Sequence, residues 1–329
     1  MNRKKILVTG AGGLIGHHLV EFLKERGYWV RGVDIRKPLF STSTADDYQL
    51  LDLREYQNCQ AAMKNDIDAV YALAADMGGM GYIAYNQSQI LQNNLLININ
   101  TIKAAVNHGV EKYFFSSSAC VYPEFKQDRS DVTALKESDV FPAQPQDAYG
   151  WEKLTSEQIV LTNHEEHNIK TYIARFHNIY GPECTWEGGK EKAPAAICRK
   201  VATAKLNGNP EIEIWGDGEQ TRSFCYIDDC LMGIYKLMES NHHEPINIGS
   251  DQLVSINQLV DLAAEIGCTN IIKNYISGPE GVRGRNSDNT LIKEYLDWAP
   301  STGLEEGLSK TYAWIEKQVQ HKLESEGIN

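Results

Sequence analysis

Three features are absent from this sequence of 329 residues: a membrane span, a cysteine framework and a basic charge balance. No apolar run is long enough to cross a bilayer, and no basic start precedes an apolar stretch, so we expect a soluble, cytoplasmic protein. The seven cysteines are scattered, odd in number and without a CxxC pair, which argues against disulfides and a zinc site, and we expect no metal. The formal net charge of −12 argues against nucleic acid as a partner.

What is present is the composition of an ordinary globular protein, with 42% apolar and 23% charged residues. The length suits one large α/β domain or two unequal ones. Because the net charge is negative, an anionic substrate would need a local basic patch inside an acidic protein.

A glycine-rich turn near the start of the chain follows a short apolar run at 5–9 and precedes apolar residues at helical spacing. Its glycines are Gly10, Gly13 and Gly16. Such a turn lets backbone N–H groups approach a pyrophosphate, and the helix N-terminus adds partial positive charge. The next predicted strand closes on Asp34, whose carboxylate can accept hydrogen bonds from a ribose 2′-OH. The pattern predicts a dinucleotide site that favours NAD, with NADP kept open because Arg36 and Lys37 follow.

Further strand and helix signals follow in alternation. We expect strands at 48–53, which offers Asp52 near the adenine, at 68–75 and at 112–118, and helices at about 86–108 and 148–166. This order predicts an α/β fold with a Rossmann-type, doubly wound parallel sheet, in which ligands bind outside the carboxyl ends of the strands.

From about residue 176 the strand signals become irregular, which predicts a smaller, mixed α/β substrate domain. We expect a nucleotide-binding domain at 1–176 with 224–250, a substrate domain at 177–223 with 251–322, and a frayed tail at 323–329. Amphipathic helices are predicted at 255–267 and 307–320.

Tyr149 and Lys153 stand four residues apart in the predicted helix at 148–166, so both side chains share one face. A lysine ammonium beside a phenol favours the phenolate, and we expect it to lower the pKa of Tyr149 toward neutrality. Tyr149 is then a candidate general base for a sugar hydroxyl, and the Ser118 hydroxyl could hold the same oxygen. The alternative is a surface tyrosine with a solvated lysine.

The glycine turn, Ser118 and the Tyr149-x3-Lys153 pair together resemble the extended short-chain dehydrogenase/reductase family that acts on nucleotide sugars, the NAD-dependent epimerases and dehydratases. The strings RFHNIYGP, RSFCYIDD and NIGS also match, so the resemblance covers nearly the whole chain. Within that family, longer strings such as ADMGGMG, SSACVYPEFKQ and GPEGVRGRNSDN are similar to the GDP-mannose 3,5-epimerases. The resemblance implies NAD as cofactor, GDP-mannose as small-molecule substrate and a homodimer built on the helices near 86–108 and 148–166.

The implied reaction gives a role to Cys120, which stands two residues after Ser118. Transient oxidation of the hexose at C4 makes the hydrogens on C3 and C5 acidic. One residue then removes a proton from one ring face, another delivers a proton to the opposite face, and GDP-L-galactose results, with a C5-only product also possible. The resemblance implies that Cys120 and Lys192 form this acid/base pair. A buried apolar thiol is the alternative for Cys120, and Lys190 competes with Lys192.

The resemblance also implies three sets of site residues. The catalytic set is Ser118, Cys120, Tyr149, Lys153 and Lys192. The cofactor set is Gly10, Gly13, Leu14, Ile15, Gly16, Asp34, Asp52, Leu53, Tyr149 and Lys153. The substrate set is Gly78, Ser118, Asn178, Glu191, Lys192, Ala193, Lys200, Gln220, Thr221, Arg222 and Arg285. Lys200, Arg222 and Arg285 would form the basic patch for a diphosphate, with Arg283 competing with Arg285.

Other functions remain open at this stage. An enzyme like GDP-fucose synthase would also epimerise but would end with net reduction by NADPH. A 4-epimerase would need Tyr149 and not Cys120. A non-catalytic NAD-binding regulator would need neither, and the intact Ser118, Tyr149 and Lys153 count against it.

Overall fold

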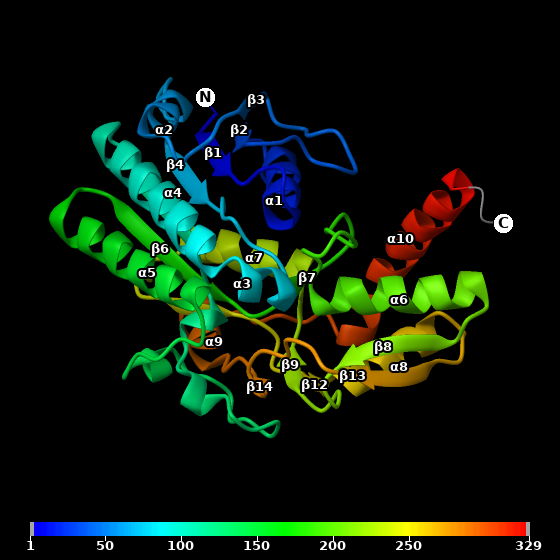
Figure 1. The fold of residues 1–329 in the computed structure, drawn as a ribbon. Coiled ribbons are helices and arrows are strands. Elements are labelled where there is room, and N and C mark those ends of the chain that lie inside the picture. Colours follow the sequence, from blue (N-terminus) through cyan, green and yellow to red (C-terminus); the bar gives the residue numbers. More distant parts are fainter. Residues whose placement is uncertain (1–2, 327–329) are drawn as a thin grey trace.

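The structure, a computed structural model that describes residues 3–326, is organised around a seven-stranded sheet (Figure 1). The strand order is β3-β2-β1-β4-β5-β6-β11, and every neighbouring pair is parallel. The strands are β1 (Lys5–Thr9), β2 (Trp29–Asp34), β3 (Asp47–Leu50), β4 (Ala69–Ala72), β5 (Lys112–Ser118), β6 (Lys170–Phe176) and β11 (Ile246–Ile248). The predicted doubly wound fold is confirmed.

Helices cover both faces of this sheet, because successive strand residues point to opposite sides. Ile6 and Val8 of β1 belong to the apolar cluster that includes α1 and α7, whereas Leu7 belongs to the cluster that includes α2, α4 and α5. The helices are α1 (Leu14–Glu25), α2 (Tyr56–Ala62), α3 (Met80–Tyr85), α4 (Gln87–Asn107), α5 (Ala148–Glu166) and α7 (Ile227–Glu239). Fully apolar strands such as β4 are therefore buried from both sides.

The chain reverses its direction across the sheet between β1 and β4, which is where doubly wound folds bind ligands. The glycine turn leaves β1 at this point, and Gly10 has a φ of +69°. A Cβ at Gly10 would come within 2.8 Å of the backbone of Leu73 and Ala74, which follow β4. Only glycine therefore allows the two strand ends to lie this close together.

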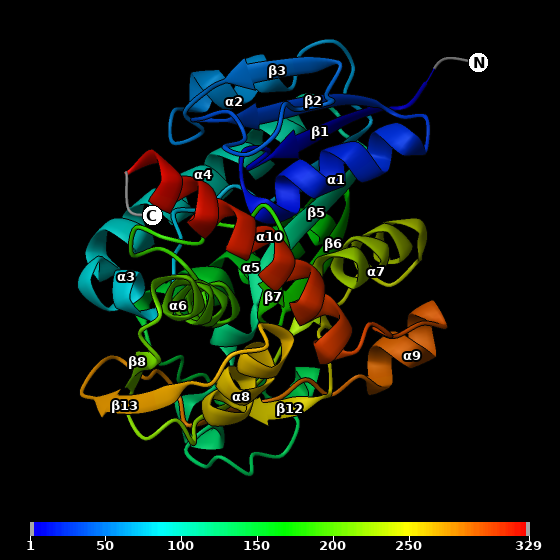
Figure 2. The same ribbon diagram turned by 90° about the vertical axis from the view of Figure 1, so that its right-hand side faces the viewer.

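A second group of elements lies beside the carboxyl ends of the strands, with α6, α8 and α10 packed on one another (Figure 2). Its helices are α6 (Ala193–Asn207), α8 (Ile256–Ile266), α9 (Thr290–Leu296) and α10 (Leu304–Ser325). Its strands are β7 (Ile179–Tyr180), β8 (Glu211–Trp215), β9 (Thr221–Ser223), β10 (Cys225–Tyr226), β12 (Leu253–Ser255), β13 (Ile272–Ile276) and β14 (Gly284–Arg285). One apolar cluster extends from α1 through α7 to α6, α8 and α10, and the predicted domain boundaries stay predictions.

Helix α10 is longer than the sequence pattern predicted, and the expectation of a frayed tail from residue 323 is wrong as far as Ser325. Leu323 packs against the main apolar cluster, and Lys322 pairs with Glu187, so the last turns are held by tertiary contacts. Glu326 is the C-cap of this helix, and the last positions of the expected tail, 327–329, lie outside the described residues. Within residues 3–326, no helix is both long and apolar enough to span a membrane.

His177, which follows β6, is fully buried and supports the fold. Its ring Nε2 lies 3.0 Å from the side-chain oxygen of Asn247, which also accepts a hydrogen bond of 2.7 Å from the Tyr122 hydroxyl. Burial lowers the pKa of His177 to about 3. A neutral imidazole in this position acts as a packed hydrogen-bond donor.

We expect His177→Gln to make the protein less sensitive to acid. The folded pKa of about 3 lies below the ordinary value of 6.5, so the unfolded chain takes up the proton first and stability falls as pH drops through 6.5. Between pH 7 and pH 5 the wild type should lose about 2 kcal/mol more stability than the variant, measured by urea unfolding. The exposed His321→Gln is the control, and an equal loss in all three proteins would contradict this role.

Candidate active site

A cavity of about 590 Å³ opens at the carboxyl ends of the sheet strands, between the glycine turn and α6. This is the size and position at which α/β enzymes bind cofactor and substrate together. All five predicted catalytic residues line it: Ser118, Cys120, Tyr149, Lys153 and Lys192. Residues from three separate parts of the chain therefore meet in one place.

The cofactor end of the cavity is formed by the glycine turn and the start of α1. Five predicted cofactor residues line it: Gly10, Gly13, Leu14, Ile15 and Gly16. The N-cap of α1, Gly13, provides no side-chain cap, and the first turn holds no acidic residue. A Cβ at Gly16 would clash with the carbonyl oxygen of Gly10. An uncapped helix N-terminus behind a glycine turn fits the pyrophosphate of NAD.

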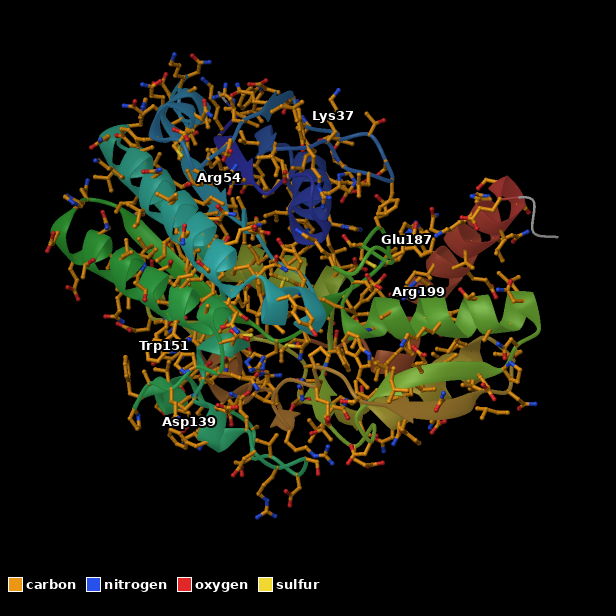
Figure 3. The ribbon with its side chains drawn as sticks, viewed as in Figure 1. Lys37, Arg54, Asp139, Trp151, Glu187 and Arg199 are labelled. Carbon is orange, nitrogen blue, oxygen red and sulfur yellow. The ribbon has the colours of Figure 1, made fainter. Side chains whose placement is uncertain are left out.

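Asp34 lies behind the glycine turn and does not line the cavity. Its carboxylate accepts hydrogen bonds from the backbone N–H groups of Gly12 at 2.9 Å and Arg36 at 3.1 Å. Arg36 itself lines the cavity, whereas Lys37 is exposed on the loop after β2 (Figure 3). The acidic residue that ends β2 thus shapes the loop at the cofactor end.

Two other predicted cofactor residues, Asp52 and Leu53, are also not brought to the cavity. The carboxylate of Asp52 is held by Arg54 at 2.6 Å, and this hydrogen bond keeps the pKa of Asp52 below its usual value. Leu53 is buried in the apolar cluster under α2. A role for either side chain at the cofactor therefore stays a prediction.

The three residues predicted to oxidise the sugar, Ser118, Tyr149 and Lys153, are here called the oxidation residues. They are positioned by β5 and the first turns of α5. The side chain of Asp147 caps α5 by accepting from Gly150 N–H at 2.9 Å, which fixes the helix start. Tyr149 and Lys153 lie on the same helix face as predicted, with Lys153 Nζ 5.6 Å from the Tyr149 ring centre. Ser118 ends β5, and its hydroxyl accepts from the Cys120 N–H at 3.2 Å.

The expected lowering of the pKa of Tyr149 is wrong for this structure. Burial raises the pKa of Tyr149 well above its usual value, and negative charge on Cys120 and Glu152 raises it further, while a hydrogen bond with Ser118 opposes the rise. Lys153 does not reverse this because its ammonium lies 3.7 Å from a carboxylate oxygen of Glu152, which balances its charge. The phenol is therefore protonated at neutral pH.

Cys120 lies in the short 3₁₀ turn Ala119–Val121 that follows β5. Its side chain is partly exposed and lines the cavity, so it is not an apolar thiol turned into the core. Arg285 directs its Nη1 to the sulfur at 3.2 Å, while its Nε donates to Gln127 Oε1 at 2.6 Å. This guanidinium can accompany negative charge on the sulfur during proton transfer.

The structure separates the two competing lysines of the loop before α6. Lys192 is the N-cap of α6 and lines the cavity, and burial lowers its pKa while Cys120 opposes the shift. Lys190 Nζ instead lies 3.4 Å from a carboxylate oxygen of Asp76 and 3.9 Å from the ring centre of Tyr82. Lys190 also borders the cavity, but its ammonium is engaged by these two partners.

Most of the predicted substrate residues come together. Ten of them line the cavity: Gly78, Ser118, Asn178, Glu191, Lys192, Ala193, Lys200, Gln220, Arg222 and Arg285. Thr221 does not, because its hydroxyl donates to the carbonyl of Ser130 at 2.6 Å. Glu191, which precedes α6, pairs at 3.0 Å with Arg199 of that helix, and Arg199 is labelled in Figure 3.

Two cations of the predicted basic patch, Arg222 and Lys200, already donate hydrogen bonds to backbone carbonyls. Burial, together with repulsion from Arg285, lowers the pKa of Arg222 to about 9, and its guanidinium donates to the carbonyl of Val282 at 2.6 Å. Lys200 donates to the carbonyl of Glu213 at 2.5 Å. Arg283 pairs with the exposed Asp217 and does not line the cavity, so of these two arginines only Arg285 does.

Sequence reasoning missed several lining residues: Met77, Met80, Gln146, Trp215 and Glu280. Trp215 carries a sequence signal, because it stands next to a glycine in the polar string WGDGEQ. In the structure its side chain is 40% exposed. Gly278 lets this indole approach, because a Cβ there would lie 2.5 Å from the ring. Met77 and Met80 lie in the string ADMGGMG and Glu280 lies in GPEGVRGRNSDN, both of which carried the family resemblance, whereas Gln146 has no local pattern that marks a site.

Comparisons with known proteins agree with this geometry. Residues 6–249 match the model of the NAD dependent epimerase/dehydratase family. The chain is 48% identical to GDP-mannose 3,5-epimerase of Arabidopsis thaliana over 96% of this chain and 83% of that protein. It is 28% identical to GDP-L-fucose synthase 1 of Arabidopsis thaliana over 96% of this chain and 94% of that protein.

Solved structures show the same architecture. MoeE5 in complex with UDP-glucose and NAD is 28% identical, with a TM-score of 0.81 over 96% of this chain and 99% of that one. UDP-glucose 4-epimerase from Thermotoga maritima is 26% identical, with a TM-score of 0.86 over 96% of this chain and 99% of that one. The sheet, the glycine turn and these matches together show that the chain belongs to the NAD-dependent epimerase/dehydratase family.

Proposed function

We propose that this protein epimerises GDP-mannose at C3 and C5 to give GDP-L-galactose, through transient oxidation at C4. The observation that carries the proposal is that Cys120 and Lys192 line the same cavity as Ser118, Tyr149 and Lys153. A redox centre alone would suffice for inversion at C4. A thiol and an amine beside it are what inversion at the neighbouring carbons requires.

The oxidation residues act on the C4 hydroxyl. The glycine turn with Gly10, Gly13 and Gly16 would hold NAD, which would supply the hydride acceptor for C4 and the return of that hydride. Ser118 holds the hydroxyl oxygen, and Tyr149 takes its proton when the carbonyl forms. Burial raises the pKa of Tyr149, so the phenol must lose its own proton before it can act as this base, and the phenolate that then forms is a strong one. Lys153, with its Nζ 5.6 Å from the ring centre, supplies only part of a counter-charge because Glu152 balances the rest.

The epimerisation residues act on the carbons next to the transient ketone. The sulfur of Cys120, with the Arg285 guanidinium at 3.2 Å, exchanges a proton with one ring face. Lys192 exchanges a proton with the other face. Because burial lowers the pKa of Lys192, its ammonium gives up a proton more readily than a solvated lysine does.

The protein also has a face suited to a second copy of itself. On α4, Leu96 is 48% exposed and Ile99 is 41% exposed. On the neighbouring α5, Trp151 is 45% exposed (Figure 3). Aromatic and aliphatic residues of this kind favour contacts between proteins. We infer a homodimer formed through α4 and α5.

The central test uses GDP-mannose with the purified protein in deuterated water. We expect GDP-L-galactose labelled at C3 and C5, with no net change in nicotinamide absorbance at completion, read by mass spectrometry and NMR. A GDP-fucose-synthase-like enzyme would consume NADPH in proportion to product. Absence of deuterium from every sugar would contradict the proposal.

Cys120→Ala should separate cofactor binding from proton exchange. We expect bound NAD to remain at the wild-type level and deuterium uptake at one or both carbons to fall by about 10²-fold or more, the usual contribution of an acid/base group. The exposed Cys268→Ala is the matched control and should exchange normally. Wild-type exchange in Cys120→Ala would show that the thiol has no such role.

The two lysines of the loop before α6 should behave differently. We expect Lys192→Met to reduce deuterium uptake by about 10²- to 10⁴-fold, because the second acid/base group is lost. Lys190→Met removes a half-exposed ion pair and should stay within about tenfold of the wild-type rate. Equal losses in the two variants, measured by the same exchange assay, would contradict the assignment.

A further inference from the structure

The segment that connects β2 to β3, residues 35–46, is described in full and contains no helix or strand. It is longer than the median connection of about 4–6 residues in compact domains, and connections of this length often have a function. We call this segment the strap. It faces the loop 181–192, which carries Lys192, and Figure 3 labels Lys37 on the strap and Glu187 on that loop.

Both ends of the strap are fixed to the nucleotide-binding half of the molecule. Near its start, the backbone carbonyl of Arg36 accepts a hydrogen bond of 2.6 Å from the Tyr48 hydroxyl. At its end, the carboxylate of Asp46 pairs with Lys24 at 2.6 Å and accepts from the Val30 N–H at 2.7 Å. The contacts made by the middle of the strap therefore join this half to whatever they touch.

The first of these middle contacts is polar and includes Ser41, His17 and Glu183. The Ser41 hydroxyl donates to the Glu183 carboxylate and lies 2.7 Å from His17 Nε2. A hydroxyl has one hydrogen to donate, so the hydrogen of the imidazole is assigned to Nε2, which donates to Ser41. His17 belongs to α1 and is 7% exposed, whereas Glu183 belongs to the loop 181–192. One serine thus joins α1, the strap and that loop.

The backbone of Glu183 supports the importance of this contact. Its φ of +57° lies in the left-handed region, which is uncommon for a residue other than glycine. Such a conformation persists where the surroundings hold it, and it is found at ligand clamps. The two residues that follow, Cys184 and Thr185, line the main cavity. The contact with Ser41 and His17 therefore holds one wall of that cavity in place.

The second middle contact is apolar. The ring of Phe40 meets that of Trp314 on α10 edge to face, with the ring centres 4.8 Å apart and the planes at 81°. Aromatic pairs in this arrangement attract beyond the area that they bury. Phe40 remains 36% exposed, so the contact lies at the surface and can open without disturbing the core.

The strap closes the wall of the cavity beside the glycine turn. Between Gly12 and Gly13 on one side and Pro38 and Phe40 on the other lies a crevice of about 20 Å³. This is room for about one water molecule, far less than a nucleotide needs. Arg36, at the start of the strap, lines the main cavity itself. A dinucleotide at the glycine turn would therefore lie directly behind the strap.

We propose that the strap, fastened through Ser41 to His17 and Glu183 and through Phe40 to Trp314, retains the dinucleotide at the glycine turn. The need for retention rests on the proposed function. An enzyme that returns the same hydride to C4 must keep its reduced cofactor until the ketone has been reduced. A reductase, in contrast, must exchange its cofactor in every turnover.

The test measures the release of NAD from the purified holoprotein, as exchange of bound radiolabelled NAD for excess unlabelled NAD. We expect Ser41→Ala and Phe40→Ala each to release NAD about tenfold faster than the wild type, because each removes one of the two middle contacts. Ser43→Ala is the matched control on the strap. The Ser43 hydroxyl accepts from the Ala45 N–H at 3.3 Å, within the strap, and its loss should leave release unchanged.

Combined variants identify which contacts act together. Ser41→Ala should have no further effect on release in a Glu183→Ala background, because the two residues form one contact. Ser41→Ala combined with Phe40→Ala should release NAD about 10²-fold faster than the wild type, because the two contacts are separate. With saturating NAD, kcat for deuterium uptake should stay within about twofold in Ser41→Ala and Phe40→Ala, and free NADH should accumulate after GDP-mannose is added, read by its fluorescence.

The outcomes distinguish two failures. If the wild type takes up no deuterium from GDP-mannose, the proposed function is wrong, and the NAD release rates still support or overturn the strap. If the wild type takes up deuterium but Ser41→Ala and Phe40→Ala release NAD no faster than Ser43→Ala, the proposed function stands and the retaining role of the strap is overturned.

Discussion

The contact between the Arg285 guanidinium and the Cys120 sulfur, at 3.2 Å, is the interaction on which the proposed chemistry of this cavity depends. It gives a thiol at the end of a sheet strand a cationic partner and so distinguishes it from a packing cysteine. It also joins two distant parts of the chain, because Arg285 belongs to β14 and Cys120 follows β5. The second group of elements thereby completes the site that the sheet begins.

The same constraint explains why so many charged groups are buried around the cavity. Lys153, Glu152 and Arg285 are each less than a tenth exposed, and each has a charged or polar partner within reach. Charges removed from water remain ionised only when they are paired. The positions of these charged groups are therefore coupled to those of their partners.

Local patterns in the sequence predicted much of the site. The glycine turn, the four-residue spacing of Tyr149 and Lys153, and the place of Cys120 after Ser118 each depend on neighbours in the chain, and the structure brings them together. What local patterns could not show depends on partners far away in sequence. The raised pKa of Tyr149 comes from burial, Thr221 is engaged by Ser130, and the last turns of α10 are held by tertiary contacts.

The account makes one central geometric claim: the Cys120 sulfur and the Lys192 nitrogen lie on opposite faces of the hexose ring. The measurement that tests this claim most directly is a crystal structure of the protein with NAD and GDP-mannose bound. The account predicts that C3 and C5 lie between the sulfur and the nitrogen, with the C4 oxygen at Ser118 and Tyr149. A complex in which both groups contact the same ring face, or in which either points away from the sugar, would contradict it.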